Sequence, residues 1–103
     1  NVQTEQENQL ESLSVAQVQS IVEFSQAESL DLTAGDIIIE YDGVHITSAQ
    51  QLVEEVKDKA QNSQVEMIVI RDKRPMRLIL AGGIIGVRII TKNISKEEIN
   101  FVF

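Results

Sequence analysis

Short apolar runs, each ended by a turn sequence, alternate along this chain with one longer amphipathic segment. The runs are rich in Ile and Val or alternate with polar residues, which is typical of β-strands. Strands are predicted over residues 17–23, 36–41, 44–46, 65–70, 76–80 and 84–90. Asp42-Gly43 and the charged segment 72–75 are the turn sequences that join two pairs of these strands.

Two other segments have the capping residues and spacing of helices. Ser25 is a candidate N-cap, with Glu28 at the second position of a capping box. Thr47 is the candidate N-cap of a longer helix, with Gln50 in the matching position. Apolar residues then recur at helical spacing, at Ala49, Leu52, Val53, Val56 and Ala60. Several short strands and two helices predict an α+β domain, with Leu52 in its core.

Length, composition and charge exclude several classes of protein. The 103 residues and 43% hydrophobic content suit one folded domain, and the absence of cysteine excludes disulfides and thiolate-bound metal. The net charge is −7, and all 9 basic residues follow residue 56. Few aromatic residues are available to stack on bases, so nucleic acid is not an expected partner. No apolar run approaches the roughly 20 residues of a membrane helix, so no membrane insertion is expected.

Residue types that carry catalysis or bind metals form no recognisable arrangement. His45 is the single histidine, and no serine lies in a Gly-x-Ser-x-Gly sequence. The carboxylates of the first half are spaced like helix faces and caps, not like an acid–base pair. We therefore expect no catalytic residue, metal site or cofactor in this chain.

Several short sequences, in the same order and at the same intervals, resemble those of a bacterial-type PDZ domain. Residues 26–36 (QAESLDLTAGD) are similar to the family's short helix and Leu-x-x-Gly-Asp turn, and residues 48–52 (SAQQL) to the start of its long helix. Residues 71–73 (RDK) stand where the family usually has Arg-Asp-Gly. The resemblance implies a PDZ-like α+β fold, with a partly open sheet or barrel of five to six strands and two helices.

The chain departs from this family in the position of the loop that receives a peptide's terminal carboxylate. That loop has an apolar-Gly-apolar sequence and usually precedes the first strand, but no such sequence precedes Val15. Residues 83–87 (GIIGV) have this character and follow the strand 76–80. We therefore predict a circular permutation that places the loop and its groove strand at the C-terminal end. The other interpretation is that these glycines form only a turn and a bulge between strands.

The resemblance implies a module that captures an extended peptide or a protein C-terminus with apolar residues, by strand addition next to a helix. The predicted binding residues are Gly83, Ile84, Ile85, Gly86 and Val87 in the loop, Ile89 on the groove strand, and Ala49, Val53, Val56 and Lys57 on the helix. Ala49 replaces the histidine of PDZ domains that select Ser or Thr, which favours an apolar residue in the peptide. Lys57 is placed to attract an acidic peptide residue at the rim.

Two alternative functions stay open. In the first, the chain is a regulatory PDZ-like domain of a larger enzyme, such as a serine protease of the high-temperature-requirement type. In the second, it is a structural module whose own tail fills the groove. Residues 1–14 are expected to form a flexible lead-in, residues 15–92 the domain and residues 93–103 a tail. Phe101, Val102 and Phe103 have the form that such grooves capture, which predicts head-to-tail self-association if the chain ends there.

Overall fold

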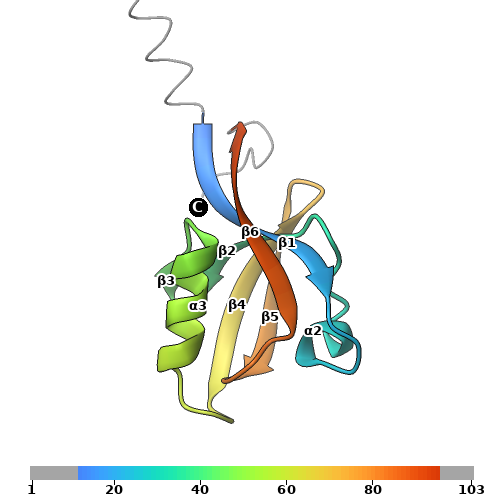
Figure 1. Cartoon of the computed structure of the whole chain (residues 1–103), viewed down its shortest axis with the longest axis vertical. Coiled ribbons are helices and arrows are strands. Elements are labelled where there is room, and N and C mark those ends of the chain that lie inside the picture. Colours follow the sequence, from blue (N-terminus) through green and yellow to red (C-terminus); the bar gives the residue numbers. More distant parts are fainter. Residues whose placement is uncertain (1–11, 96–103) are drawn as a thin grey trace, which may run out of the picture.

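The structure, a computed structural model, describes residues 12–95 (Figure 1). Its strands are β1 (Ser12–Ile21), β2 (Ile37–Tyr41), β3 (Val44–His45), β4 (Gln64–Arg71), β5 (Arg74–Ala81) and β6 (Val87–Ser95). Its helices are α2 (Gln26–Ser29) and α3 (Ala49–Asp58). The predicted tail sequence at Phe101, Val102 and Phe103 lies outside the described residues.

One antiparallel sheet contains all six strands in the order β5-β4-β2-β1-β6, with β3 paired to β2. The sheet curls but is not closed, because β5 and β6 stand at its two edges without pairing. This is the α+β, six-stranded, partly open arrangement with two helices that the sequence predicts. Among residues 12–95, neither helix has the length and apolar content needed to cross a membrane.

Two tight turns set the register of the hairpins. Asp42 and Gly43 have φ values of 52° and 81°, and Asp72 and Lys73 have φ values of 51° and 64°. Positive φ at both central residues is the type I′ geometry, whose twist matches that of the flanking strands. The predicted Asp42-Gly43 turn is therefore confirmed, whereas the second turn is shorter than predicted because β5 already begins at Arg74.

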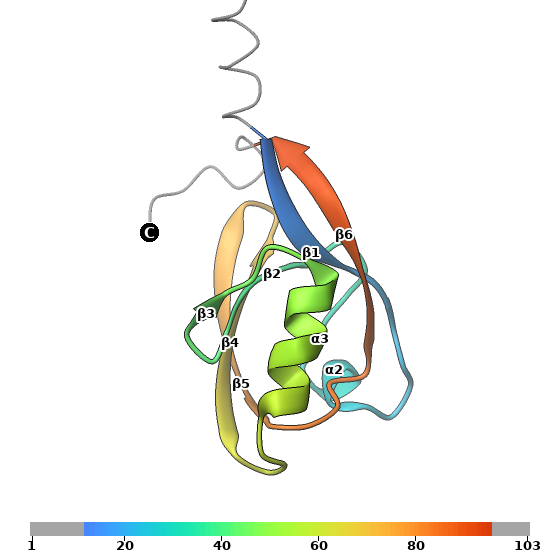
Figure 2. The same ribbon diagram turned by 60° about the vertical axis from the view of Figure 1, so that its left-hand side comes forward.

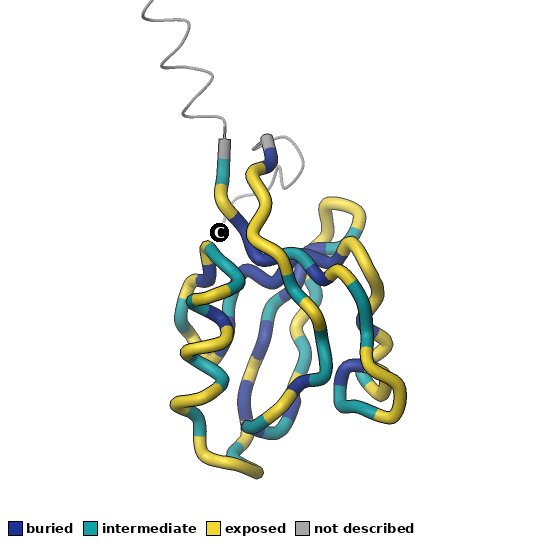
Figure 3. The backbone as a smooth tube through the Cα atoms, viewed as in Figure 1, coloured by how far each residue is buried: buried dark blue, intermediate teal, exposed yellow. Residues whose placement is uncertain are grey.

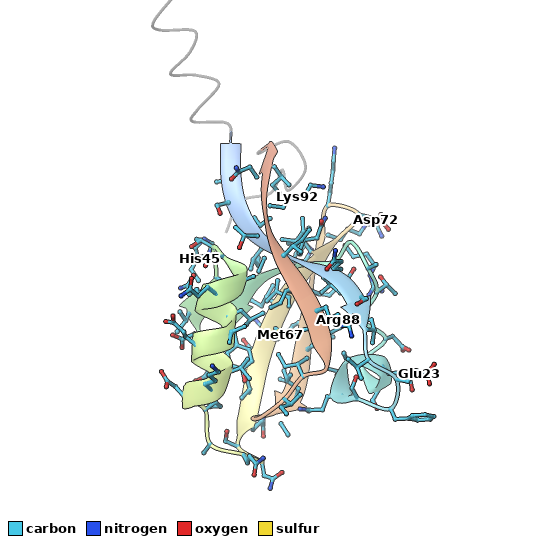
Figure 4. The ribbon with its side chains drawn as sticks, viewed as in Figure 1. Glu23, His45, Met67, Asp72, Arg88 and Lys92 are labelled. Atoms are coloured by element: carbon cyan, nitrogen blue, oxygen red, sulfur yellow. The ribbon has the colours of Figure 1, made fainter. Side chains whose placement is uncertain are left out.

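The main core lies between the curled sheet and the helices, and Figure 3 marks the buried segments in dark blue. Its fully buried side chains include Ile38, Tyr41, Leu52 and Met67, and Figure 4 shows Met67 in the interior, behind β6. A second, smaller cluster consists of Val15, Ile37, Ile39, Ile70 and Ile94. Leu52 thus packs in the core as predicted, with 1% of its surface exposed.

The helix caps follow the predictions in one case and differ by one residue in the other. Ser25 caps α2 by accepting the Glu28 amide, and Glu28 Oε1 accepts the amide of Phe24. For α3, the predicted N-cap Thr47 is wrong, because Ser48 accepts the amide of Gln51 instead. Gln51 Oε1 in turn accepts the amide of Thr47, so the capping box is shifted by one position.

Several element bounds also differ from the predictions. Strand β1 covers Ser12–Ile21 and so starts before the predicted strand 17–23, and β6 covers Val87–Ser95 instead of residues 84–90. These two strands pair along their whole length, which extends both into segments expected to be lead-in and tail. Ala60, predicted to belong to the apolar stripe of the helix, lies beyond α3 and is exposed.

Candidate peptide-binding groove

An open apolar pocket lies between α3 and the start of β6, with a volume of about 230 Å3. Its lining residues are Leu52, Val53, Val56 and Lys57 from α3, and Ile84, Ile85, Val87 and Ile89 from β6 and the loop before it. Seven of the eight are aliphatic, and Lys57 contributes the one charge. Such a surface suits an apolar side chain with a polar or charged group at its edge.

The predicted binding residues fall into two groups around this pocket. Val53, Val56, Lys57, Ile84, Ile85, Val87 and Ile89 line it, and the prediction omitted Leu52, which also does. Gly83 and Gly86 belong to the loop at its end but are not among its lining residues. Ala49 is not among them either, because it lies at the first turn of α3, which contacts β6 closely.

Helix α3 and strand β6 enclose a wedge instead of a channel of constant width. At the start of the helix, the Ala49 amide donates to Thr91 Oγ1 of β6 over 2.9 Å. Ser14 Oγ of β1 also donates to the carbonyl of Thr47 over 2.8 Å. Figure 2 shows the first turn of α3 against β1 and β6, and the rest of the helix diverging from β6 toward the β5–β6 loop. The pocket occupies the wide end of this wedge.

The loop 82–86 approaches its neighbours so closely that two of its positions require glycine. A Cβ on Gly82 would lie 2.2 Å from the carbonyl oxygen of Ala60. A Cβ on Gly86 would lie 2.1 Å from the Cβ of Ser25, and Gly86 also has a φ of +91°. Contacts this short are not tolerated, and an L-residue at that φ is strained. These glycines therefore hold the loop against α2 and the end of α3.

Three carbonyl groups of this loop, those of Ile84, Ile85 and Gly86, accept hydrogen bonds from α2 or the segment before it. Gln26 Nε2 donates to the carbonyls of Ala81 (3.0 Å) and Ile84 (3.1 Å), and its Oε1 accepts the Ala81 amide (2.9 Å). The amides of Ala27 and Val22 donate to the carbonyls of Ile85 and Gly86, both over 2.8 Å. The side chain of one helical residue and two backbone amides thus fix the orientation of the loop.

The amides of residues 83–86 have no hydrogen-bond acceptor within the part of the chain that the structure describes. Successive N–H groups are therefore free beside the apolar pocket, which Ile84 and Ile85 of this loop line. Clusters of such N–H groups bind anions, including carboxylates. The loop therefore offers uncommitted N–H groups beside an apolar cavity.

The outer edge of β6 is available for a further strand. Strand β6 pairs only with β1 among the described strands, so the backbone groups on its other edge have no strand partner there. Side chains alternate along a strand, which places Val87, Ile89 and Thr91 on one face. Val87 and Ile89 line the pocket and Thr91 contacts α3, so this is the face turned toward the helix.

Polar groups with catalytic potential do not gather at this pocket. His45 lies at the surface on β3, exposed and remote from the loop (Figure 4). Within residues 12–95 no group of three or more His, Cys, Asp or Glu side chains is placed to hold a metal ion. What the arrangement offers is an apolar cavity, free amides and an unpaired strand edge.

A family model for the PDZ domain matches residues 17–71. The match covers more than half of the chain, which therefore belongs to the PDZ domain family, a family of peptide-binding modules. The match ends with β4, so the loop 82–86 and β6 lie outside it. None of the curated proteins matches this chain in sequence.

Solved structures support the same fold. The PDZ domain of an SdrC-like protein from Listeria monocytogenes has a TM-score of 0.63 and 21% identity, over 72% of this chain and 85% of that one. The PDZ domain of the corresponding Listeria innocua protein has a TM-score of 0.63 and 22% identity, over 73% and 92%. A solution structure from Geobacillus thermodenitrificans has a TM-score of 0.53 and 31% identity, over 63% and 74%.

Proposed function

We propose that this domain captures the C-terminal end of an extended apolar peptide by strand addition to β6. The peptide carboxylate binds the free amides of residues 83–86, and the last side chain enters the pocket between α3 and β6. The observation that supports this most is the loop itself: the carbonyls of residues 84–86 accept hydrogen bonds from α2 and the segment before it, while the amides of residues 83–86 have no acceptor in the described chain. Strand addition supplies affinity through the main chain, and the pocket supplies selectivity.

The proposal includes a circular permutation relative to the usual order of PDZ elements. In this chain the carboxylate loop follows β5, and the groove strand is the last strand, β6. Support comes from β1 and β6, which pair along their length and so bring the two ends of the domain together. When chain ends lie close together, moving one strand from the start to the end of a domain changes the fold little.

The side chains around the groove suggest what the peptide contains. The pocket is aliphatic and lacks an aromatic lining residue, so a medium-sized apolar residue such as Val, Leu or Ile fits at the peptide's end. Lys57 stands at the rim and favours an acidic residue nearby, by at most about 1 kcal/mol because the pair is exposed. Micromolar affinity, about −8 kcal/mol, is the expected range.

An amide-shift titration by NMR tests the proposal directly. The probe is a short apolar peptide ending in Val, added once with a free carboxylate and once amidated. We expect shifts at residues 83–89 and 52–57 with the free acid, and responses weakened at least about tenfold with the amide, because the carboxylate binds the loop. Equal responses to both peptides, or no response to either, would contradict a carboxylate-reading groove.

A further inference from the structure

We infer that Thr91 closes the upstream end of this groove, so that the domain reads only about the last three residues of its ligand. The inference rests on the proposed function, since it concerns how much of a captured peptide the groove can hold. It makes Thr91 a specificity-determining residue, although Thr91 does not line the pocket.

The contact between Thr91 and α3 is incompatible with a strand passing between them. The Ala49 amide nitrogen lies 2.9 Å from Thr91 Oγ1, so the backbone of the helix is one side chain away from β6. A strand added to β6 needs about 4.8 Å on the β6 side alone, and further room for its own side chains next to α3. The groove therefore ends where this hydrogen bond forms.

The position of Thr91 along β6 sets the number of peptide residues that fit. In an antiparallel addition with the carboxylate at the loop, the last peptide residue lies beside Val87 and the third from last beside Ile89, because strand side chains repeat every two residues. The fifth from last would lie beside Thr91, where the helix already occupies the space. The fourth from last, beside Ile90, must already turn away from the sheet to avoid this contact, so about three residues can pair with β6.

The start of α3 is also tied to β1, but it is the Thr91 hydrogen bond that closes its gap to β6. Ser14 Oγ donates to the carbonyl of Thr47, which ties the residue before the N-cap to β1. Thr91 in turn accepts the amide of the first helical residue, one of the N–H groups that a helix leaves without an internal partner. Breaking the Thr91 contact to admit a longer peptide would leave that N–H without this partner.

The test compares peptide length in three proteins. Two peptides with the same last three residues, N-acetylated and either three or six residues long, are titrated by calorimetry into the wild-type chain and its Thr91→Val and Thr91→Ser variants. In the wild type and Thr91→Ser, which keeps the hydroxyl, both lengths should bind within about twofold. Thr91→Val has nearly the same shape but cannot accept the Ala49 amide, so the longer peptide should gain about three- to tenfold there.

The inference would be overturned, and the proposed function left intact, if the wild type bound the six-residue peptide about tenfold tighter than the three-residue peptide, with NMR shifts extending to residues 91–93. Equal length dependence in all three proteins, with the longer peptide favoured, would overturn it as well. Failure of both peptides to bind any of the proteins would overturn the proposed function itself. Thr91 is exposed, so both substitutions should leave the thermal unfolding temperature nearly unchanged, which circular dichroism checks.

Discussion

Arg71 holds the buried carboxylate of Asp36 with two hydrogen bonds, from Nε to Oδ1 over 2.8 Å and from Nη2 to Oδ2 over 2.7 Å. Thr33 donates its amide to the same carboxylate over 3.0 Å, and Arg71 also donates to the carbonyl of Asp31 over 2.9 Å. These contacts join the turn before β2 to the end of β4. The Gly-Asp sequence of the turn is thus part of the framework of the fold.

This pair makes stability depend on pH. Burial alone raises the pKa of Asp36, but hydrogen bonds from Arg71 and Thr33 outweigh it and leave the pKa below its ordinary value of 3.8. Because the pKa is lower in the folded state, the stabilisation is fully present above the unfolded value and is lost as pH falls through the folded one. We expect Asp36→Asn to reduce the free energy of unfolding at pH 7 by about 2–4 kcal/mol.

Urea unfolding at pH 7 and pH 3 measures this effect, and the difference between Asp36→Asn and the wild type should be smaller at pH 3. Glu66→Gln is the matched control, because Glu66 and Arg77 form an exposed ion pair at 3.5 Å. Exposed pairs contribute little, so the control should change stability by less than about 0.5 kcal/mol. Equal losses in the two variants would show that the burial of Asp36 has no special role.

Gly86→Ala should displace the loop that carries the free amides. Its Cβ would overlap Ser25, in addition to the cost of a positive φ. We expect a loss of about 2–4 kcal/mol in unfolding free energy, together with weaker peptide binding. Gly43→Ala is the control, since Gly43 has a similar φ of +81° but open space around it; a loss of about 1–2 kcal/mol is expected there. Similar losses from both substitutions would argue against the overlap.

Gln26→Ala should weaken peptide binding more than it weakens the fold. The side-chain amide of Gln26 makes three hydrogen bonds to the backbone of Ala81 and Ile84, and nothing else in the described chain holds those groups. A mobile loop must be ordered on binding, so affinity should fall about tenfold. In the control Gln50→Ala, the residue bonds only Glu54 on the exposed face of α3, and affinity should be unchanged. Fluorescence anisotropy with a labelled peptide measures both.

Val53→Asp should abolish detectable binding of an apolar peptide while leaving the domain folded. Val53 lines the pocket but is 41% exposed, so a carboxylate there remains solvated and still opposes both the apolar side chain and the peptide carboxylate. Ile79→Asp is the control, with a comparable exposure of 51% on β5, at a position outside the pocket. If Ile79→Asp weakened binding as much, the pocket would not be the peptide site.

Local rules in the sequence predict a large part of the fold. The Asp42-Gly43 turn, the Ser25 cap and the core position of Leu52 each follow from a few neighbouring residues. The N-cap of α3 could not be chosen locally, because Thr47 and Ser48 are both good caps. The carbonyl of Thr47 receives a hydrogen bond from Ser14 on β1, a contact between residues far apart in sequence.

The binding site was also predictable only in part, because some of its contacts join residues that are far apart in the sequence. The glycines of the loop and the apolar stripe of α3 are visible as patterns, but Gln26 and Thr91 act through partners more than forty positions away. Nothing in the spacing around either residue indicates that contact. The end of α3 depends on a distant partner as well, since Lys59 leaves the helix and pairs with Asp42 of the β2–β3 turn.

The pairing of β1 with β6 has a mechanical consequence. Ser12 pairs with Ser95, and the two strands run antiparallel from there to Ile21 and Val87. Tension applied between residues 12 and 95 would therefore load the ladder from one end and open its hydrogen bonds in sequence, as in a zipper, instead of shearing them together. Because β6 is also the edge beside the pocket, such a pull would reach Thr91 before Ile89 and Val87, and would separate the groove strand from the rest of the sheet while β2, β4 and β5 stayed paired.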